Sequence, residues 1–413
     1  MKIRIPLEEL IGSLEKSSLA ALTKESQDEE VRKIRPTDSC IKITASKDAV
    51  TFESSSKEVA ALRSTKDKDI IVKKEGACCV EAKSYMKMLK TIPKDCSVQI
   101  SYKPNKNYAK DAFGGIIQPN GILTTIAFKN KKEIRRGTND TFPVEEFAPV
   151  DYAHKKVLFS IQAKTLQEAV SQVLFATDPS DLSEMLDSIA IVVSGNKIHF
   201  AGTDGKRCAI YSVVANEKDA AILLDDQKTL IDGILLKTSC KSFDDYDVIE
   251  VIDCEDAEHV ILSADNTKIR LRVASDEVKQ QFPNFINILS VICPTSIVLN
   301  KSQLLEAVEF LSQYNPEKSI YHVCKGKSEI KIEAARRGAN PESATVECEP
   351  IAASLINPAA MSNQFIIDGC KKTGGKDKGC KVQISFSKDE RKIRMQATDD
   401  TSFVYLQQSM TLE

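Results

Sequence analysis

The chain has 413 residues, of which 42% are hydrophobic and 28% are charged, a composition typical of a soluble globular protein with about two to four domains. Its 57 basic and 59 acidic residues leave a net charge of −2, which excludes a protein that coats nucleic acid over its whole surface. No apolar run reaches the roughly 18 residues of a membrane span, and the N-terminal MKIRIPLEEL lacks the apolar core of a signal peptide. We therefore expect a cytoplasmic protein.

The first third of the chain contains two predicted halves of similar order. A helix over 6–22 (PLEELIGSLEKSSLAAL) precedes strands over 40–64, and a strand, a helix and a strand follow over 78–102. The charge run 23–33 (TKESQDEEVRK) and the Gly-, Asn- and Pro-rich segment 103–121 interrupt this order. We expect both segments to be mobile surface loops.

The middle third has the same order of predicted elements. Residues 163–176 (AKTLQEAVSQVLFA) place apolar side chains at helical spacing, and 188–214 indicates three strands joined by Gly-Asn and Asp-Gly turns. A second half follows, with a strand and a helix over 220–238 and further strands over 247–275.

The last third repeats the order once more. An amphipathic helix over 300–314 (NKSQLLEAVEFLSQY) precedes strands over 319–335 and 343–350, and a helix over 363–375 precedes strands over 380–408. A unit that recurs three times in one order predicts an α+β protein of three repeated domains, each with two helices packed on antiparallel sheets. The predicted domains are 1–153, 154–292 and 293–413.

Residues that would support catalysis or bind a metal are dispersed along the sequence. The twelve cysteines form no C-x-x-C pair and the chain lacks a secretion signal, which predicts reduced, mostly buried thiols. The four histidines are too far apart to indicate a metal site, and we expect no cofactor. The acidic pairs Asp244–Asp245 and Asp399–Asp400 leave a metal-dependent enzyme as a third alternative, although turns at strand ends produce such pairs without a catalytic role.

The segment 199–214 (HFAGTDGKRCAIYSVV) places a polar cluster between two strand-like runs, with no nucleophile or base nearby. Taken alone, it predicts a hairpin turn whose polar residues face water. Its phrase GTDGKRCA (202–209) resembles the bacterial sliding clamp, the beta subunit of DNA polymerase III, and so do RPT (35–37) and QFPNF (281–285). AKSYMKMLKTIP (82–93) and FIIDGC (365–370) also fit the second helices of that family.

The resemblance implies a ring of DNA-clamp domains. Two copies would join head to tail as a homodimer, so that six similar domains surround duplex DNA and their helices line the hole. A sliding clamp catalyses no reaction, because its role is to tether a polymerase to the template. The implied function is therefore that of a processivity factor for a DNA polymerase. A clamp-fold scaffold that binds proteins without encircling DNA is the main alternative.

The resemblance also implies a groove near the junction of domains 2 and 3, where peptide tails of polymerases and clamp-loader subunits bind. Arg207 would offer donors to a peptide carboxylate or carbonyl. Lys206 and Cys208 stand where the family usually has His and Leu, and either YLQQ or SMTL corresponds to the family's C-terminal ending. The implied groove residues are Leu186, Thr203, Gly205, Arg207, Cys208, Phe365, Val404, Tyr405, Leu406, Gln407 and Gln408.

A ring needs only diffuse attraction for DNA, because enclosure prevents dissociation. Arg35, in the RPT phrase, resembles an arginine of the family that contacts DNA, and lysines on the predicted helices would supply further positive charge. Glutamates share these helices, so the sequence leaves open which face each lysine occupies. The candidate lysines are Lys16, Lys83, Lys87, Lys90, Lys164, Lys228, Lys301, Lys371 and Lys372.

Overall fold

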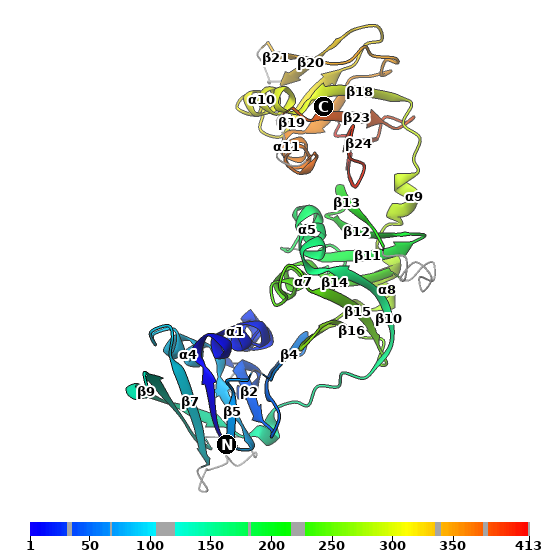
Figure 1. Cartoon of the computed structure of the whole chain (residues 1–413). Coiled ribbons are helices and arrows are strands. Elements are labelled where there is room, and N and C mark those ends of the chain that lie inside the picture. Colours follow the sequence, from blue (N-terminus) through cyan, green and yellow to red (C-terminus); the bar gives the residue numbers. More distant parts are fainter. Residues whose placement is uncertain are drawn as a thin grey trace. The chain divides into compact units, whose positions relative to one another are not determined.

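The computed structural model describes residues 1–30, 35–66, 68–104, 120–180, 183–215, 228–334, 340–374 and 379–411 (Figure 1). The chain forms two compact units. Unit 1 contains residues 1–166 and 236–273, and unit 2 contains residues 167–235 and 274–413. Both units combine helices with antiparallel sheets, which confirms the predicted α+β class. The three domain ranges given above stay a prediction.

Unit 1 contains one large antiparallel sheet and several short helices. Its helices are α1 (Leu7–Ser17), η1 (Ala20–Leu22), α2 (Lys24–Gln27), η2 (Pro36–Ser39), α4 (Ala82–Leu89) and η3 (Val144–Glu146). Its strands are β1 (Lys2–Pro6), β2 (Cys40–Ala45), β3 (Val50–Ser55), β4 (Val59–Thr65), β5 (Ile71–Lys74), β6 (Gly76–Glu81), β7 (Ser97–Pro104), β8 (Gly121–Lys129), β9 (Lys132–Phe142), β10 (His154–Gln162), β15 (Val248–Cys254), β16 (His259–Ala264) and β17 (Thr267–Arg272).

The order of strands in the unit 1 sheet is β10-β15-β16-β17-β4-β3-β2-β6-β9-β8-β7-β1-β5. Strands β4 and β17, which are distant in sequence, pair antiparallel from Val59↔Leu271 to Arg63↔Thr267. Helix α1 contacts β3, β4 and α4, and it buries Leu7, Leu10 and Leu14 at helical spacing in one apolar core. This confirms the amphipathic helix predicted at the start of the chain.

Unit 2 contains two sheets. Its helices are η4 (Leu174–Ala176), α8 (Asp276–Gln281), α9 (Phe285–Leu289), α10 (Lys301–Ser312) and α11 (Asn363–Lys372), whereas α5 (Ala163–Val173) and α7 (Gly233–Cys240) cross between the two units. Its strands are β11 (Ser188–Ser194), β12 (Lys197–Thr203), β13 (Arg207–Val214), β14 (Lys228–Asp232), β18 (Thr295–Asn300), β19 (Lys318–His322), β20 (Glu329–Ala334), β21 (Glu342–Glu347), β22 (Ala359–Ser362), β23 (Lys381–Phe386), β24 (Lys392–Ala397) and β25 (Phe403–Gln408).

The larger sheet of unit 2 has the order β14-β11-β12-β13-β25-β24-β23-β18, and the smaller has the order β21-β20-β19-β22. Strand β13 pairs antiparallel with β25 near the C-terminus, from Arg207↔Gln407 to Tyr211↔Phe403. Helices α10 and α11 pack against each other and against strands of both sheets, as Figure 1 shows for the C-terminal part of the chain.

The structure also departs from the prediction for the charge run. Within 23–33 the described residues form α2 rather than a loop, because the Thr23 hydroxyl accepts a hydrogen bond from the Ser26 amide and Ser26 is buried. Residues 31–33 of this run and 105–119 of the second predicted loop lie outside the described residues. The short helices α8 and α9, which flank the QFPNF phrase, were not predicted.

The thiols and acidic pairs have structural explanations. Nine of the twelve cysteines are buried, which agrees with the predicted burial of the thiols. Asp244 forms an ion pair with Lys16 at 2.6 Å, and the Asp400 carboxylate accepts a hydrogen bond from the Ser402 amide in the turn before β25.

Across the part of the chain that the structure describes, no helix has the length and apolar character needed to cross a membrane.

Candidate functional site

The polar cluster of the segment 199–214 forms the tight turn between β12 and β13. The Thr203 hydroxyl accepts a hydrogen bond from the Gly205 amide and donates one to the Arg207 carbonyl, and the Asp204 carboxylate accepts the amides of Lys206 and Arg207. Gly205 has a φ of +82°, a conformation that favours glycine. The turn is therefore determined by its own sequence.

Gly202, just before the turn, allows η4 to approach β12 closely. A Cβ atom at this position would lie 2.5 Å from the Val173 carbonyl oxygen and 2.9 Å from the Thr177 methyl group. Only glycine fits against this backbone, which gives a steric reason for the first residue of the GTDGKRCA phrase.

The Arg207 side chain lies on the face of the sheet that η4 and α11 cover. Its guanidinium donates to Asp204 Oδ2 at 2.8 Å, to Asp368 Oδ2 at 2.6 Å and to the Phe175 carbonyl at 2.9 Å. Its charged carbon lies 4.6 Å from the centre of the Phe365 ring. Burial disfavours its charged form, but Tyr405, Asp368 and Asp204 outweigh this effect and raise the pKa of Arg207. The guanidinium therefore holds the turn, η4 and α11 together through one donor of each of its three nitrogens, and its role towards a peptide stays a prediction.

The opposite face of the same sheet carries a small apolar hollow, which we call the groove hollow. Cys208 and Leu406 are directly paired across β13 and β25, so their side chains share this face. They form the floor with Pro283 and Ile288, while Lys206, Lys392 and Gln408 lie at the rim. The hollow measures about 120 Å³ and is lined by Thr203, Gly205, Lys206, Arg207, Cys208, Pro283, Ile288, Lys392, Leu406, Gln407 and Gln408.

Seven of the eleven predicted groove residues line this hollow, and four do not. Val404 belongs to the apolar cluster that also contains Cys208 and Leu406. Tyr405 and Phe365 lie on the other face, beside Phe175 and Arg207, because side chains alternate along a strand. Leu186 lies in a turn before β11, where its carbonyl accepts the Asp178 amide, and the neighbouring Met185 packs against the apolar cluster instead. Phe365, Tyr405 and Leu186 thus do not line the groove hollow, and a role for them in peptide binding stays a prediction.

Four lining residues were missed by the sequence analysis. Lys206 and Pro283 lie inside the phrases GTDGKRCA and QFPNF, so the signal for them was present but not used. Ile288 and Lys392 come from α9 and the start of β24, and no local pattern connects them with β13. Cys208 keeps its proton at neutral pH, because burial raises its pKa to about 12.

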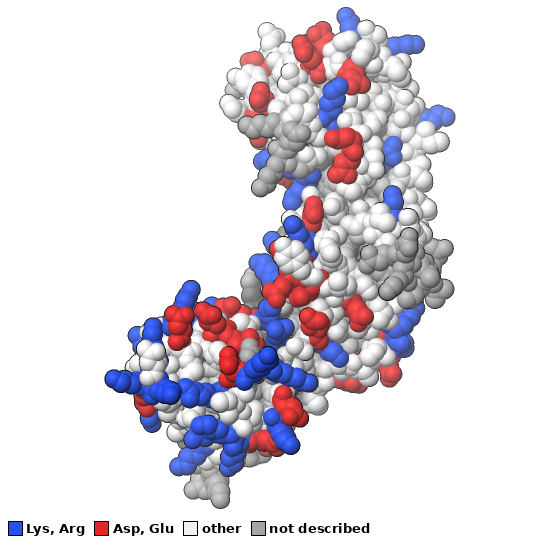
Figure 2. Space-filling model, in the orientation of Figure 1, with Lys and Arg blue, Asp and Glu red and all other residues white. Residues whose placement is uncertain are grey.

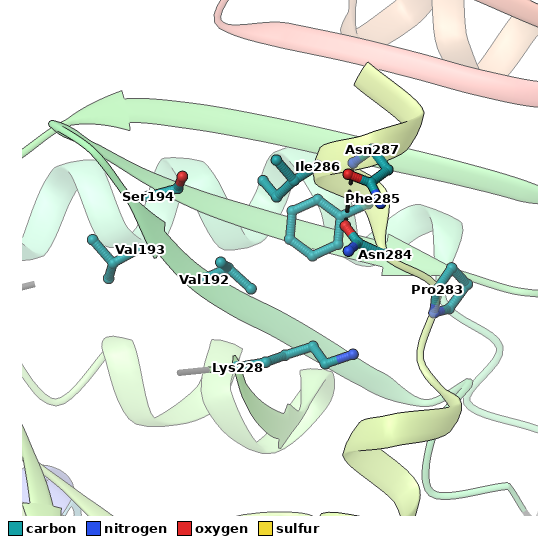
Figure 3. A pocket seen from close by; sticks show the side chains of 9 residues that line it. All are labelled: Val192, Val193, Ser194, Lys228, Pro283, Asn284, Phe285, Ile286 and Asn287. Carbon is teal, nitrogen blue, oxygen red and sulfur yellow. Dashed lines mark hydrogen bonds between the residues drawn. The ribbon is translucent and has the colours of Figure 1, made fainter. Parts of the chain in front are cut away.

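Two further hollows adjoin the groove hollow and share a residue with it. The first shares Pro283 and is lined by Val192, Val193, Ser194, Lys228, Pro283, Asn284, Phe285, Ile286 and Asn287 (Figure 3). The second is an open depression that shares Lys392 and is lined by Val291, Ile292, Ser387, Lys388, Asp389 and Lys392. A partner longer than one side chain could therefore continue along this surface in either direction.

Five of the nine lysines predicted to contact DNA already have partners. Lys301 is only 7% exposed and donates to the Thr373 carbonyl at 2.8 Å, and Lys228 donates to the Phe282 carbonyl at 2.8 Å. Lys301 is therefore buried, whereas Lys228 is partly exposed, and a role of either lysine in DNA binding stays a prediction. Lys372 donates to the Ser171 carbonyl, and ion pairs join Lys90 to Glu15 and Lys16 to Asp244.

Other candidates remain at the surface. Lys83, Lys87, Lys164 and Lys371 are exposed on α4, α5 and α11. Arg35 is exposed too, but its guanidinium contacts Glu25 at 2.9 Å and Asp38 at 3.2 Å, so it would have to exchange a carboxylate for a phosphate in order to contact DNA.

Taken over its full length, the chain has the sliding-clamp fold. The DNA polymerase III subunit beta from Pseudomonas aeruginosa matches with a TM-score of 0.78 and 18% sequence identity over 100% of both chains. The DNA polymerase sliding clamp from Bacillus subtilis matches with a TM-score of 0.76 and 17% identity, also over 100% of both chains. The beta subunit from Streptococcus pyogenes matches with a TM-score of 0.76 and 15% identity over 99% of this chain and 100% of that one. No protein-family model and no curated protein sequence matches the chain.

Proposed function

We propose that the protein is a DNA sliding clamp, which encircles duplex DNA as a head-to-tail homodimer and binds peptide tails of polymerase and clamp-loader subunits. The observation that carries the proposal is the agreement of fold with solved sliding clamps from end to end of the chain. One fold can serve several functions, so the residues of this chain must support the assignment as well. Three features do so: two open strand edges, exposed helix lysines and the groove hollow.

Strand β9 offers a basic edge for assembly. It pairs with β8 along its length, but with β6 only through Thr141 and Phe142. No other described strand pairs with residues 132–140 on that side, and Lys132, Arg135 and Arg136 are exposed there. Figure 2 shows Lys and Arg side chains crowded over the part of unit 1 that contains β7 and β9. An open edge of this kind favours pairing with another strand.

Strand β21 offers an acidic edge. It is the terminal strand of the smaller sheet and carries Glu342 and Glu347 but no basic residue. The adjacent α10 adds exposed Glu306 and Glu309. A basic edge on one copy and an acidic edge on the next are complementary, as head-to-tail closure of a ring requires.

The ring is tested by its retention on DNA. The purified protein, incubated with nicked plasmid and passed through a sizing column at moderate salt, should remain on circles and leave DNA cut to linear form. Equal loss of protein from circular and linear DNA would contradict encirclement.

The two strand edges are tested by charge reversal. The double variant Lys132→Glu and Arg136→Glu should weaken the dimer in sedimentation, and adding Glu342→Lys and Glu347→Lys should restore it. Lys268→Glu, a charge reversal on β17, serves as the control.

The groove hollow supports the peptide-binding part of the proposal. A buried apolar floor with a polar rim is the usual form of a site that anchors one side chain of a partner. Cys208 and Leu406 supply that floor, and Gln408 at the end of β25 is exposed beside them. A fluorescein-labelled peptide with a central Leu-Leu pair should bind, and the same peptide with Ala-Ala should not.

A clamp-fold scaffold that does not encircle DNA remains the second candidate, and one observation favours it. The exposed face of α10 carries Glu306 and Glu309, while its one lysine, Lys301, is buried. That face would repel phosphate if it lined a hole. A scaffold would bind the Leu-Leu peptide but would show no difference between circular and linear DNA, so the two experiments together separate the candidates.

A further inference from the structure

The hollow that contains Lys228 has a different chemical character from the groove hollow. It measures about 280 Å³ and combines an apolar wall from Val192, Phe285 and Ile286 with polar groups from Ser194, Lys228, Asn284 and Asn287. Figure 3 shows the Lys228 side chain extended along the hollow towards the segment that carries Pro283. The mixture of one cation, two amides and an apolar wall is suited to an anionic group on an otherwise apolar ligand.

Among the described residues, Lys228 is held in place by contacts with uncharged groups. It pairs with Val192 across β14 and β11, so its stem follows the apolar face of the sheet. Its ammonium donates to the Phe282 carbonyl at 2.8 Å and lies 5.6 Å from the centre of the Phe282 ring. An ammonium has three donors, and none of the described residues that line the hollow is acidic. Partial burial lowers the pKa of Lys228, because removal from water disfavours its charged form.

The Lys228 hollow and the groove hollow share one lining residue. Pro283 lines both, and α9 presents Phe285, Ile286 and Asn287 to the Lys228 hollow and Ile288 to the groove hollow. Within α9 the Asn284 side chain accepts the Asn287 amide at 3.1 Å, which fixes the start of this short helix. The two hollows therefore lie on either side of a rigid Pro283–Ile288 segment in unit 2.

We propose that the Lys228 hollow is a second subsite of the peptide groove, which binds a glutamate or aspartate side chain of the peptide whose apolar residue occupies the groove hollow. This inference rests on the proposed peptide-binding function. A half-buried ammonium forms a stronger hydrogen bond to a carboxylate than an exposed lysine does, because water and salt screen it less. Lys228 would thus select acidic tails, whereas the apolar floor alone would accept many sequences.

The test measures the binding of matched peptides. One glutamate is moved stepwise along both flanks of a fluorescein-labelled decapeptide with a central Leu-Leu pair, and each peptide has a glutamine twin. For the wild-type protein, at least one position should give about tenfold tighter binding of the glutamate form. Lys228→Met should remove this preference and leave binding of the glutamine twins unchanged, while Lys228→Arg should retain most of it. Lys197→Met, an exposed lysine outside both hollows, is the matched control.

Each result has a distinct meaning. Equal affinity for the glutamate and glutamine forms at every position would overturn the subsite. A preference for glutamate that survives in Lys228→Met would also overturn it, because the rim lysines Lys206 and Lys392 would then be responsible for the preference. If no Leu-Leu peptide binds any variant, the groove itself is wrong. Ser194→Phe fills the hollow without removing Lys228 and should also abolish the preference, which keeps the test decisive if Lys228→Met fails to fold.

Discussion

Two pairs of distant strands hold the sheets of this protein together, and they are built differently. In unit 1, β4 pairs with β17, and in unit 2, β13 pairs with β25, each through five antiparallel residue pairs. The β4–β17 pairing is flanked by a partly buried hydrogen bond between Arg63 and Thr267 and by an exposed ion pair between Arg272 and Glu58. The β13–β25 pairing has the buried Arg207 cluster on one face and the groove hollow on the other.

The difference shows how a strand pairing can also provide a binding site. At β4–β17, backbone hydrogen bonds and surface ion pairs are enough to join two segments, and such ion pairs contribute little each. At β13–β25, the Arg207 cluster lies on the face towards η4 and α11, and the opposite face places the buried side chains of Cys208 and Leu406 in the lining of a hollow. Four predictions test this contrast, in order of decreasing effect.

Replacing the arginine of each pairing should have very different consequences for stability. Arg207→Ala leaves Asp204 and Asp368 without their partner in a largely buried cluster and should lower the free energy of unfolding by about 3 kcal/mol. Arg272→Ala removes an exposed pair with Glu58 and should cost less than about 1 kcal/mol. Urea unfolding followed by circular dichroism measures both, and similar losses in the two variants would refute the contrast.

The floor of the groove hollow should dominate peptide affinity. Ile288→Ala removes apolar surface from a half-buried position and should weaken binding of the Leu-Leu peptide about tenfold, with a small effect on folding. Leu186→Ala is the matched control, because Leu186 lies outside the hollow. A larger loss in Leu186→Ala than in Ile288→Ala, by fluorescence polarisation, would show that the groove lies elsewhere.

The β13–β25 pairing should lose stability in alkali through Cys208. Burial raises the pKa of this thiol to about 12, so the folded chain keeps its proton while the unfolded chain releases it near pH 9. Its contribution to stability is complete below pH 9 and is lost as the pH rises towards 12. Cys208→Ala should therefore lose about 1 kcal/mol less than the wild type between pH 9 and 10. Parallel pH profiles of the two proteins would contradict this role.

The rim lysines should have the smallest effect. Lys206 and Lys392 are exposed, so replacing both with Gln should weaken binding of an acidic peptide less than about threefold at 0.15 M salt. The loss should grow when the salt is reduced and should fall mainly on the association rate. A large, salt-independent effect, measured by stopped-flow fluorescence, would mean that these side chains are desolvated on binding.

The elements of this fold could be predicted largely because their signals are local. The Asp-Gly turn, its hydrogen bonds and the amphipathic helices α1, α5 and α10 depend on residues a few positions apart. The three-fold repetition of these local units then indicated the clamp fold. The lysines show the limit of such reasoning: Lys301 begins α10, but its ammonium reaches the Thr373 carbonyl after α11, a contact that only the packing of the two helices creates.

The site was predicted only in part, for a related reason. The residues contributed by the β12–β13 turn and by the end of β25 were found from their phrases, but the partners of those residues come from elsewhere in the chain. Asp368 contacts Arg207, and Ile288 completes the hollow, although neither belongs to the same local motif. The face of the sheet on which the Tyr405 side chain lies depends on the register of β25 against β13. The sequence of β25 alone does not determine this register.

The charges on the two open edges also affect how one copy of the chain meets another. If two β9 edges met, Lys132, Arg135 and Arg136 of both strands would repel, and two β21 edges would bring glutamates together. Identical edges are thus discouraged from joining, which protects newly made chains from stacking into aggregates. Only a β9 edge and a β21 edge attract each other. The residues that would join two copies in the proposed ring therefore also oppose aggregation through identical edges.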